Sequence, residues 1–468
     1  MTTLIRSVKV IDGTGKPAYT ADVLVENKKI AAIGYFPNKT AEKIIDGMGY
    51  YLAPGFIDIH SDADHSLSIF SNPEQKEYLA QGVTTIIGGN CGSSLAPLLY
   101  GTLESIQKWA DINQINVDWQ TMADFLKVLE KRNLGVNFFT LVGHSTIRRS
   151  IVGEAFRDLT DKELEVFKKV LSEALEQGGL GFSTGLSYAH SQRTSFKEIE
   201  ALAEVVKKHD GVYATHLRNE KEGLLDSINE TIKIAEETGA KIIVSHFRPL
   251  IGNEENFKQA LELLEKTKTE TFFDVYPFDV SMMPIYKLLP LWAQNGGLAL
   301  MREQLLDHQL FQRILRELPP LKKEDLTIAS APGNEFLVGK NIGEIAKNQG
   351  VPISEALLKL MITTRLKALV FYKNINMDLV LESLIHPKSF ISSNTIRLQE
   401  KAFLKFLQMV NGKLPIEEAI RKITSQPAQM FNLQERGMIK ESFFADLVMF
   451  KNPNAPVIEV TIINGQIK

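Results

Sequence analysis

The sequence predicts an α/β protein: a (β/α)8 barrel of the TIM type with a small β-sandwich beside it. Eight apolar, strand-like runs alternate along the chain with amphipathic helical runs, and this alternation is typical of a parallel barrel. Both end regions instead hold short strands of alternating polarity, which indicates a separate β unit. A segment before the eighth strand is too long for a loop and indicates an insertion.

The elements of the predicted barrel follow one another at regular intervals. The eight strands are expected at 51–62, 84–92, 136–145, 179–188, two within 212–247, 270–278 and 388–394. Amphipathic stretches at 103–112, 121–132, 161–177, 196–209 and 254–266 predict helices between them.

Residues 212–247 form the clearest strand–helix–strand unit. Its two apolar strands end at His216 and His246, and the helix between them stops at Gly239, a residue type that commonly ends helices. Apolar strands in such a unit pair in parallel, and functional side chains gather at the carboxyl ends of parallel strands. We therefore expect both histidines to point into one pocket, although a single histidine of this kind is more often a hydrogen-bonded core residue.

The predicted domains follow from these patterns. Residues 1–50 and 429–468 are expected to pair into the β-sandwich, and residues 51–428 to form the barrel. Within the barrel, residues 279–387 are expected to form an inserted subdomain that caps the pocket. Its own helical patterns lie at 298–316 and 343–362.

Composition excludes several classes of protein. Of the 468 residues, 44% are hydrophobic and 23% are charged, which is typical of a soluble globular protein. A net charge of −3 provides no basic surface for nucleic acid or an anionic membrane. The single cysteine, Cys91, excludes an internal disulfide and favours a reducing cytoplasm, and no apolar run has the length of a signal peptide or membrane span.

Polar side chains gather at the carboxyl ends of the predicted strands. They are His60, Asp62, Cys91, His144, Ser183, Tyr188, His216, His246, Asp274, Tyr276 and Asn394. A thiolate with imidazoles and a carboxylate suits zinc, which would activate a water and polarise a carbonyl for amide hydrolysis. A lone Cys91 is more commonly a small buried hydrophobe, but its glycine-flanked setting, GGNCGSS, favours a site.

Several motifs in this order resemble the amidohydrolase superfamily, and within it the N-acyl-D-amino-acid deacylases (D-aminoacylases). The motifs are PGFIDIH, GVTTIIGGNCGSSLAPL, GHSTIR, GFSTGLSY, THLRNE, SHFRP, DVYPF and the closing segment ITSQPAQMFNLQERGMIKESFFADLVMF. The resemblance covers nearly the whole chain. It implies a distorted barrel, a flanking β domain made of both end regions, and a small N-acyl amino acid as substrate.

The same resemblance assigns expected roles to individual residues. It implies one tightly bound zinc ion held by Cys91, His216 and His246. Arg248 stands where the family has a lysine that helps to bind the substrate carboxylate. Tyr188 and Tyr276 are expected to line the substrate pocket.

Two positions depart from the family pattern. The first strand should end His-x-His, but here it ends His60-Ser61-Asp62, so a second, weaker metal site formed by His60 and Asp62 is altered. The eighth strand should end with the aspartate that acts as general base, but here it ends with Asn394, and an amide cannot accept a proton at neutral pH. A His-Pro-Arg segment that follows this strand in the family is also missing.

Three explanations of Asn394 are open. The first is a natural loss of activity, the second is an inactivating substitution, and the third is that another carboxylate such as Asp62 or Asp64 has taken over as base. We expect a zinc-dependent hydrolase of amide C–N bonds, acting on N-acyl-D-amino acids with reduced or re-routed activity. The alternatives are a catalytically silent protein that binds an acylated amino acid or a partner, and a cyclic-amide hydrolase.

Overall fold

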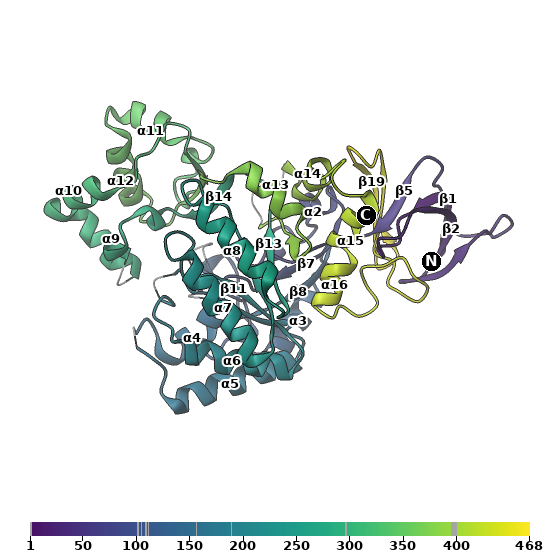
Figure 1. Ribbon diagram of the computed structural model, residues 1–468, viewed down its shortest axis with the longest axis horizontal. Coiled ribbons are helices and arrows are strands. Elements are labelled where there is room, and N and C mark those ends of the chain that lie inside the picture. Colours follow the sequence, from purple (N-terminus) through teal and green to yellow (C-terminus); the bar gives the residue numbers. More distant parts are fainter. Residues whose placement is uncertain are drawn as a thin grey trace.

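The computed structural model describes residues 2–468 except 101–102, 104, 108–109, 111, 156, 189, 295–296 and 395–399. It contains a central set of parallel strands surrounded by helices, a β domain beside it, and a subdomain that projects from the opposite side (Figure 1). No helix among the described residues has both the length and the apolar character needed to cross a bilayer.

The barrel strands lie in two parallel sheets that continue into each other. The first sheet contains β6 (Phe56–Asp58), β7 (Val83–Gly88) and β8 (Asn137–Thr140). The second has the order β17 (Ser389–Ile391), β13 (Thr271–Val275), β12 (Lys241–Val244), β11 (Val212–His216), β10 (Gly181–Gly185) and β9 (Val142–Gly143). Only Leu141 separates β8 from β9, so the two sheets supply the eight predicted strand positions in the predicted order.

A buried carboxylate connects the two remaining sheet edges, β6 and β17. Asp58 of β6 accepts hydrogen bonds from the backbone N–H of Ser393, at 3.1 Å, and from its hydroxyl, at 2.5 Å. Burial raises the pKa of Asp58 to about 7, although these hydrogen bonds act in the opposite direction. The side chain of the first strand therefore holds the segment that follows the last strand.

Amphipathic helices cover the strands. The helices are α1 (Ser68–Ser71), α2 (Lys76–Leu79), α3 (Met122–Glu130), α4 (His144–Val152), α5 (Asp161–Glu176), α6 (Phe196–Lys208), α7 (Leu224–Thr238), α8 (Glu254–Lys266), α13 (Met377–Ile385), α14 (Ala402–Met409), α15 (Ile416–Ile423) and α16 (Ser425–Met430).

The helix boundaries have local causes. Thr121 and Thr160 form capping boxes at the starts of α3 and α5, and Gly239 ends α7 in the left-handed conformation with φ 67°. Four of the five predicted helical stretches are found, as α3, α5, α6 and α8. The fifth, 103–112, lies partly outside the described residues, and its described part forms turns before η1 (Ile112–Gln114).

The predicted strand 51–62 is divided between two sheets. Its first part, β5 (Tyr51–Pro54), pairs with strands of the β domain, and its second part, β6, enters the barrel. Gly55 joins them where a Cβ atom would lie 2.1 Å from the Thr84 hydroxyl, so only glycine fits this crossing. The barrel strand therefore begins after Gly55, later than the predicted boundary at 51.

The β domain combines both end regions of the chain. Its strands are β1 (Thr2–Val10), β2 (Tyr19–Glu26), β3 (Lys29–Gly34), β4 (Lys43–Asp46), β5, β18 (Leu447–Lys451), β19 (Val457–Ile463) and β20 (Gln466–Ile467). They form one hydrogen-bonded sheet that branches at β1, which pairs with β4 along its first half and with β5 at its end. Ile5, Val23, Leu52 and Leu447 belong to its own apolar core, and both termini lie in it (Figure 1).

The inserted subdomain has a three-stranded antiparallel sheet and its own core. It contains β14 (Val280–Pro284), η2 (Ile285–Leu288), η3 (Leu291–Gln294), α9 (Gly297–Leu306), α10 (His308–Glu317), β15 (Leu326–Ser330), η4 (Glu335–Leu337), α11 (Ile342–Gln349), α12 (Ile353–Thr363) and β16 (Leu369–Lys373).

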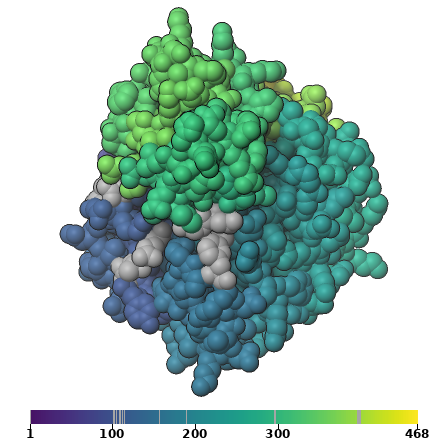
Figure 2. Space-filling view, turned by 90° about the vertical axis from the view of Figure 1, so that its left-hand side faces the viewer, coloured from purple at the N-terminus to yellow at the C-terminus, as the bar shows by residue number. Residues whose placement is uncertain are grey.

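The subdomain differs from its prediction in two respects. The patterns at 298–316 and 343–362 are each two helices: Asp307 begins α10 by accepting a hydrogen bond from the Leu310 backbone N–H, and Gly350 ends α11 before α12. The predicted segment 279–387 also includes α13, which packs against the barrel strands β13 and β17. In Figure 2 the subdomain, in green, lies over the blue and teal segments of the barrel.

We predict that Ser393→Ala destabilises the barrel, because it leaves the buried Asp58 carboxylate short of one donor. The free energy of unfolding should fall by about 1–3 kcal/mol, measured by chemical denaturation of the metal-free protein. Ser150→Ala is the matched control, since the Ser150 hydroxyl donates to the Thr146 carbonyl within α4. An equal loss in the two variants would contradict the prediction.

Candidate active site

A small cavity of about 50 Å³ lies at the carboxyl ends of the barrel strands, below the inserted subdomain. It is lined by Asp62, Cys91, Tyr188, His216, Glu220, His246, Arg248, Met282, Met283, Pro284, Lys287 and Asn394. A second cavity of about 410 Å³ adjoins it and shares Glu220, Arg248, Met283 and Lys287. The barrel therefore supplies most of the polar groups, and β14 and η2 of the subdomain close one side.

Four side chains of types that can bind a metal converge at or beside the inner cavity. Cys91 Sγ lies 3.4 Å from His246 Nε2 and 3.6 Å from His60 Nε2. His216 Nδ1 lies 3.0 Å from His246 Nε2. Among the described residues, Cys91, His60 and His246 place their donor atoms within 4.8 Å of one another, and all three are buried.

Each imidazole has an oxygen partner for the ring nitrogen that faces away from this cluster. His60 Nδ1 lies 3.1 Å from Asp274, His216 Nε2 lies 2.7 Å from the Ser187 hydroxyl, and His246 Nδ1 lies 3.4 Å from Glu220. Such partners orient a metal-binding histidine and keep its other nitrogen available as a ligand.

Negatively charged groups lie in and around the cluster. Burial alone would raise the pKa of the Cys91 thiol, but His246 and His60 hold it well below its usual value, so the thiolate is favoured. Burial and Arg248 lower the pKa of His246, whereas Cys91 and Glu220 together raise it to about 9. A buried thiolate with buried carboxylates behind it is a favourable environment for a cation.

The donor set fits zinc. Tetrahedral zinc with bonds of about 2.0–2.3 Å to nitrogen and sulfur places its ligand atoms roughly 3.3–3.8 Å apart. The distances from the Cys91 sulfur to His246 and His60, 3.4 and 3.6 Å, lie in this range. Cys91 and His246 belong both to the predicted set and to this three-residue cluster, in which His60 stands in place of the predicted His216.

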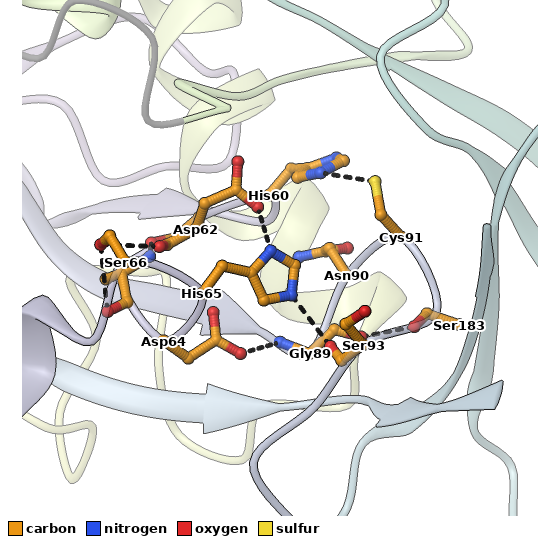
Figure 3. A network of polar contacts seen from close by, with 12 residues as sticks. His60, Asp62, Asp64, His65, Ser66, Gly89, Asn90, Cys91, Ser93 and Ser183 are labelled. Atoms are coloured by element: carbon orange, nitrogen blue, oxygen red, sulfur yellow. Dashed lines mark hydrogen bonds and ion pairs between the residues drawn. The ribbon is translucent and has the colours of Figure 1, made fainter. Parts of the chain in front are cut away.

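Asp62 and Asp64 lie in different environments (Figure 3). Asp62 lines the cavity, and its carboxylate lies 2.8 Å from His65 Nδ1. The other nitrogen of His65 lies 2.9 Å from the Ser93 carbonyl. Asp64 is fully buried and accepts a hydrogen bond from the Gly89 backbone N–H at 2.7 Å. Of the two carboxylates, Asp62 is therefore the one that faces the cavity.

Three residues of the cavity have left-handed backbone conformations. Cys91, His246 and Asn394 have φ values of 50°, 36° and 45°, and each follows the end of a barrel strand. Backbone strain of this kind costs about 1–3 kcal/mol per residue and concentrates at functional sites. Asn394 is buried and lines the cavity as predicted, while the segment predicted to depart from the family pattern lies partly at 395–399, outside the described residues.

Arg248 is already paired. Its Nη2 lies 2.6 and 2.5 Å from the two carboxylate oxygens of Glu220, and both side chains line the cavity. Arg218, on the same THLRNE segment as Glu220, binds Glu230 at 2.8 Å instead. The sequence signal for the Glu220–Arg248 pair was the presence of THLRNE and SHFRP on neighbouring strands.

The remaining predicted residues divide into two groups. Tyr188 lines the cavity, with its ring 5.1 Å from that of His216, whereas Tyr276 is buried next to Arg248 and does not line it. His144 lies outside the cavity and pairs with Glu198 at 2.8 Å. Lys287 and Met282 line the cavity but were not predicted, because the insertion resembles no motif and its register against the barrel is not visible in the sequence.

Comparison with known proteins identifies relatives over nearly the whole chain, although no protein-family model matches it. The chain is 28% identical over 462 residues to a D-aminoacylase of Alcaligenes xylosoxydans xylosoxydans, covering 96% of this chain and 87% of the relative. A crystal structure of D-aminoacylase, described as defining a novel subset of amidohydrolases, superposes with a TM-score of 0.79 at 26% identity, covering 99% and 96% of the two chains.

The chain is therefore similar over nearly its whole length to D-aminoacylases of the amidohydrolase type. A zinc-bound N-acyl-D-glutamate deacylase of Bordetella bronchiseptica in complex with a phosphonate inhibitor has the same fold, with a TM-score of 0.81 at 24% identity over 99% and 96% of the chains. The predicted amidohydrolase barrel and the predicted kinship with D-aminoacylases are confirmed.

We predict that Cys91→Ser weakens zinc binding by at least about 100-fold, since the thiolate is the one soft ligand of the cluster. Metal analysis after dialysis and competition with a chromophoric chelator would measure this. His209→Gln is the control, because His209 lies 2.8 Å from Ser172 and does not line the cavity. Retention of stoichiometric zinc by Cys91→Ser would show that the metal binds elsewhere.

Proposed function

We propose that this amidohydrolase is a zinc-dependent hydrolase of amide C–N bonds that acts on small N-acyl-D-amino acids. The observation on which the proposal depends is the convergence of Cys91, His60, His216 and His246, of which Cys91, His216 and His246 line the inner cavity. Kinship with D-aminoacylase supports the substrate class, and the zinc of the N-acyl-D-glutamate deacylase supports the metal.

The cavity residues have distinct tasks in this proposal. Cys91 and His246, with His216 or His60, would hold one zinc ion, which lowers the pKa of a water and polarises the substrate carbonyl. Asp274 and Glu220 orient the imidazoles of His60 and His246. Tyr188 and the apolar side chains of β14 exclude water from the reacting amide.

Proton transfer is the step for which this site is least equipped. Asn394 lines the cavity where the family has its general base, and an amide cannot accept the proton of the attacking water. Asp62 supplies a cavity-facing carboxylate held by His65. We therefore propose slow hydrolysis, with Asp62 acting as a substitute proton acceptor or as a ligand of a second, weaker metal ion.

A second candidate function is binding without turnover. Two observations favour it. The amide of Asn394 stands in place of the general base, and Glu220 is paired with the guanidinium of Arg248, which was expected to bind the substrate carboxylate. In that case the protein would retain zinc and bind N-acyl amino acids without hydrolysing them.

We predict that Asn394→Asp raises kcat/KM for N-acetyl-D-amino acids by about 10²–10⁴-fold, because it restores a carboxylate beside the water. Product release from a panel of N-acetyl-D-amino acids by zinc-loaded protein measures the effect. Asn411→Asp, at an exposed position, is the control for the change in charge. The L-enantiomers test the expected stereochemical preference.

The outcomes separate the two functions. A gain confined to Asn394→Asp supports a deacylase that lacks its base. Zinc retention with no turnover by either form supports the binding protein, and turnover of cyclic amides alone would replace the proposed substrate class.

A further inference from the structure

Lys287 places a positive charge in the cavity from the inserted subdomain. It lies on η2, directly after β14, and lines both the inner and the outer cavity. Its ammonium group donates to the Ser187 carbonyl at 2.8 Å and lies 5.8 Å from the centroid of the Tyr188 ring. The same ring lies beside His216, with 5.1 Å between the ring centroids, so the ammonium and the Cys91–histidine cluster share Tyr188 as a neighbour.

The two cations of the cavity differ in their availability. Arg248 donates hydrogen bonds to both carboxylate oxygens of Glu220. In contrast, none of the ion pairs found among the described residues includes Lys287. A partly buried ammonium with a single carbonyl acceptor has capacity for two more hydrogen bonds. An anion that enters the cavity would therefore meet an unpaired lysine and a neutralised arginine.

We propose that Lys287 binds the free carboxylate of the acylated amino acid and thereby determines the requirement for an acidic substrate. This inference rests on the proposed function, because it concerns the ligand of the same cavity. The adjacent β14 residues Met282, Met283 and Pro284 give the cavity an apolar wall. N-acetyl-D-leucine is therefore a suitable probe, since it combines a carboxylate with an apolar side chain.

The test compares an acid with its uncharged analogue. Binding of N-acetyl-D-leucine and N-acetyl-D-leucinamide to zinc-loaded protein is measured by calorimetry for the parent, Lys287→Met and Lys287→Arg, with hydrolysis followed in parallel. Lys287→Met should weaken binding of the acid about 10- to 100-fold and change binding of the amide by less than about twofold. Lys287→Arg should retain most of the affinity for the acid.

Lys221→Met is the matched control, because Lys221 is an exposed lysine that lines only the outer cavity. It removes a positive charge near the same cavity and should leave both affinities unchanged at pH 7, where Lys287 is protonated with or without Lys221. If Lys287 only fastened the subdomain to Ser187, its removal would weaken acid and amide equally, and this result would overturn the inference.

The experiment distinguishes failure of the inference from failure of the proposed function. Hydrolysis that does not depend on Lys287 would overturn the inference and leave the deacylase. Lys287-dependent binding without hydrolysis would support the inference and overturn the deacylase. If the parent protein bound neither N-acetyl-D-leucine nor its amide, the inference would be overturned. Hydrolysis of the panel of N-acetyl-D-amino acids would then test the proposed function independently.

We also predict a pH dependence of this binding. Burial lowers the pKa of Lys287 to about 8, with Glu220 acting against this shift and Arg248 and Lys221 adding to it. Because only the ammonium attracts a carboxylate, affinity for N-acetyl-D-leucine should fall as pH rises above about 8. The Lys287→Arg variant, whose guanidinium stays protonated, should show no such fall, and an equal fall in both proteins would assign the titration to another group.

Discussion

The geometry of the site depends on the hydrogen bonds that the buried carboxylate of Asp274 accepts. One oxygen lies 3.1 Å from His60 Nδ1 and accepts the backbone N–H of His246 at 3.0 Å, and the other accepts the Ser392 hydroxyl at 2.6 Å. A single side chain of β13 therefore fixes groups that follow three other strands. Burial would raise the pKa of Asp274, but the charge of His60 and these hydrogen bonds lower it, so the group remains an anion and a firm acceptor.

The same site divides its work between two parts of the fold. The barrel supplies the candidate metal ligands from strand ends, whose positions are set by hydrogen bonding within the sheets and by packing of a common core. The inserted subdomain has a separate core and supplies Lys287 and the apolar wall. In the proposed function, metal binding would depend on the barrel, and ligand recognition would depend on a subdomain with a core of its own.

The repeated parts of this structure could be predicted from the sequence, and the long-range pairings could not. Eight strand positions and most helices follow from periodicity, because each element buries one face against its neighbours. Cys91, His216 and His246 could be predicted because strand ends meet at one edge of a barrel. The division of 51–62 at Gly55 could not, since it depends on the approach of Thr84. The choice of Glu230 rather than Glu220 as partner of Arg218 depends on distances across folded loops, and the position of Lys287 depends on how a separate core docks.

Charge balance explains why so many ionisable groups tolerate burial around one small cavity. The Cys91 thiolate, Asp62, Asp274 and Glu220 lie in or behind it, and Arg248 neutralises Glu220 directly. Isolated buried anions of this density would be costly, so the site requires further positive charge. The pKa values of His60 and His246 are raised for this reason: the neighbouring Cys91 thiolate and Asp274 carboxylate favour protonated, positively charged imidazoles. A divalent ion would displace those protons and satisfy the same anions at shorter range, which links metal binding to the stability of this end of the barrel.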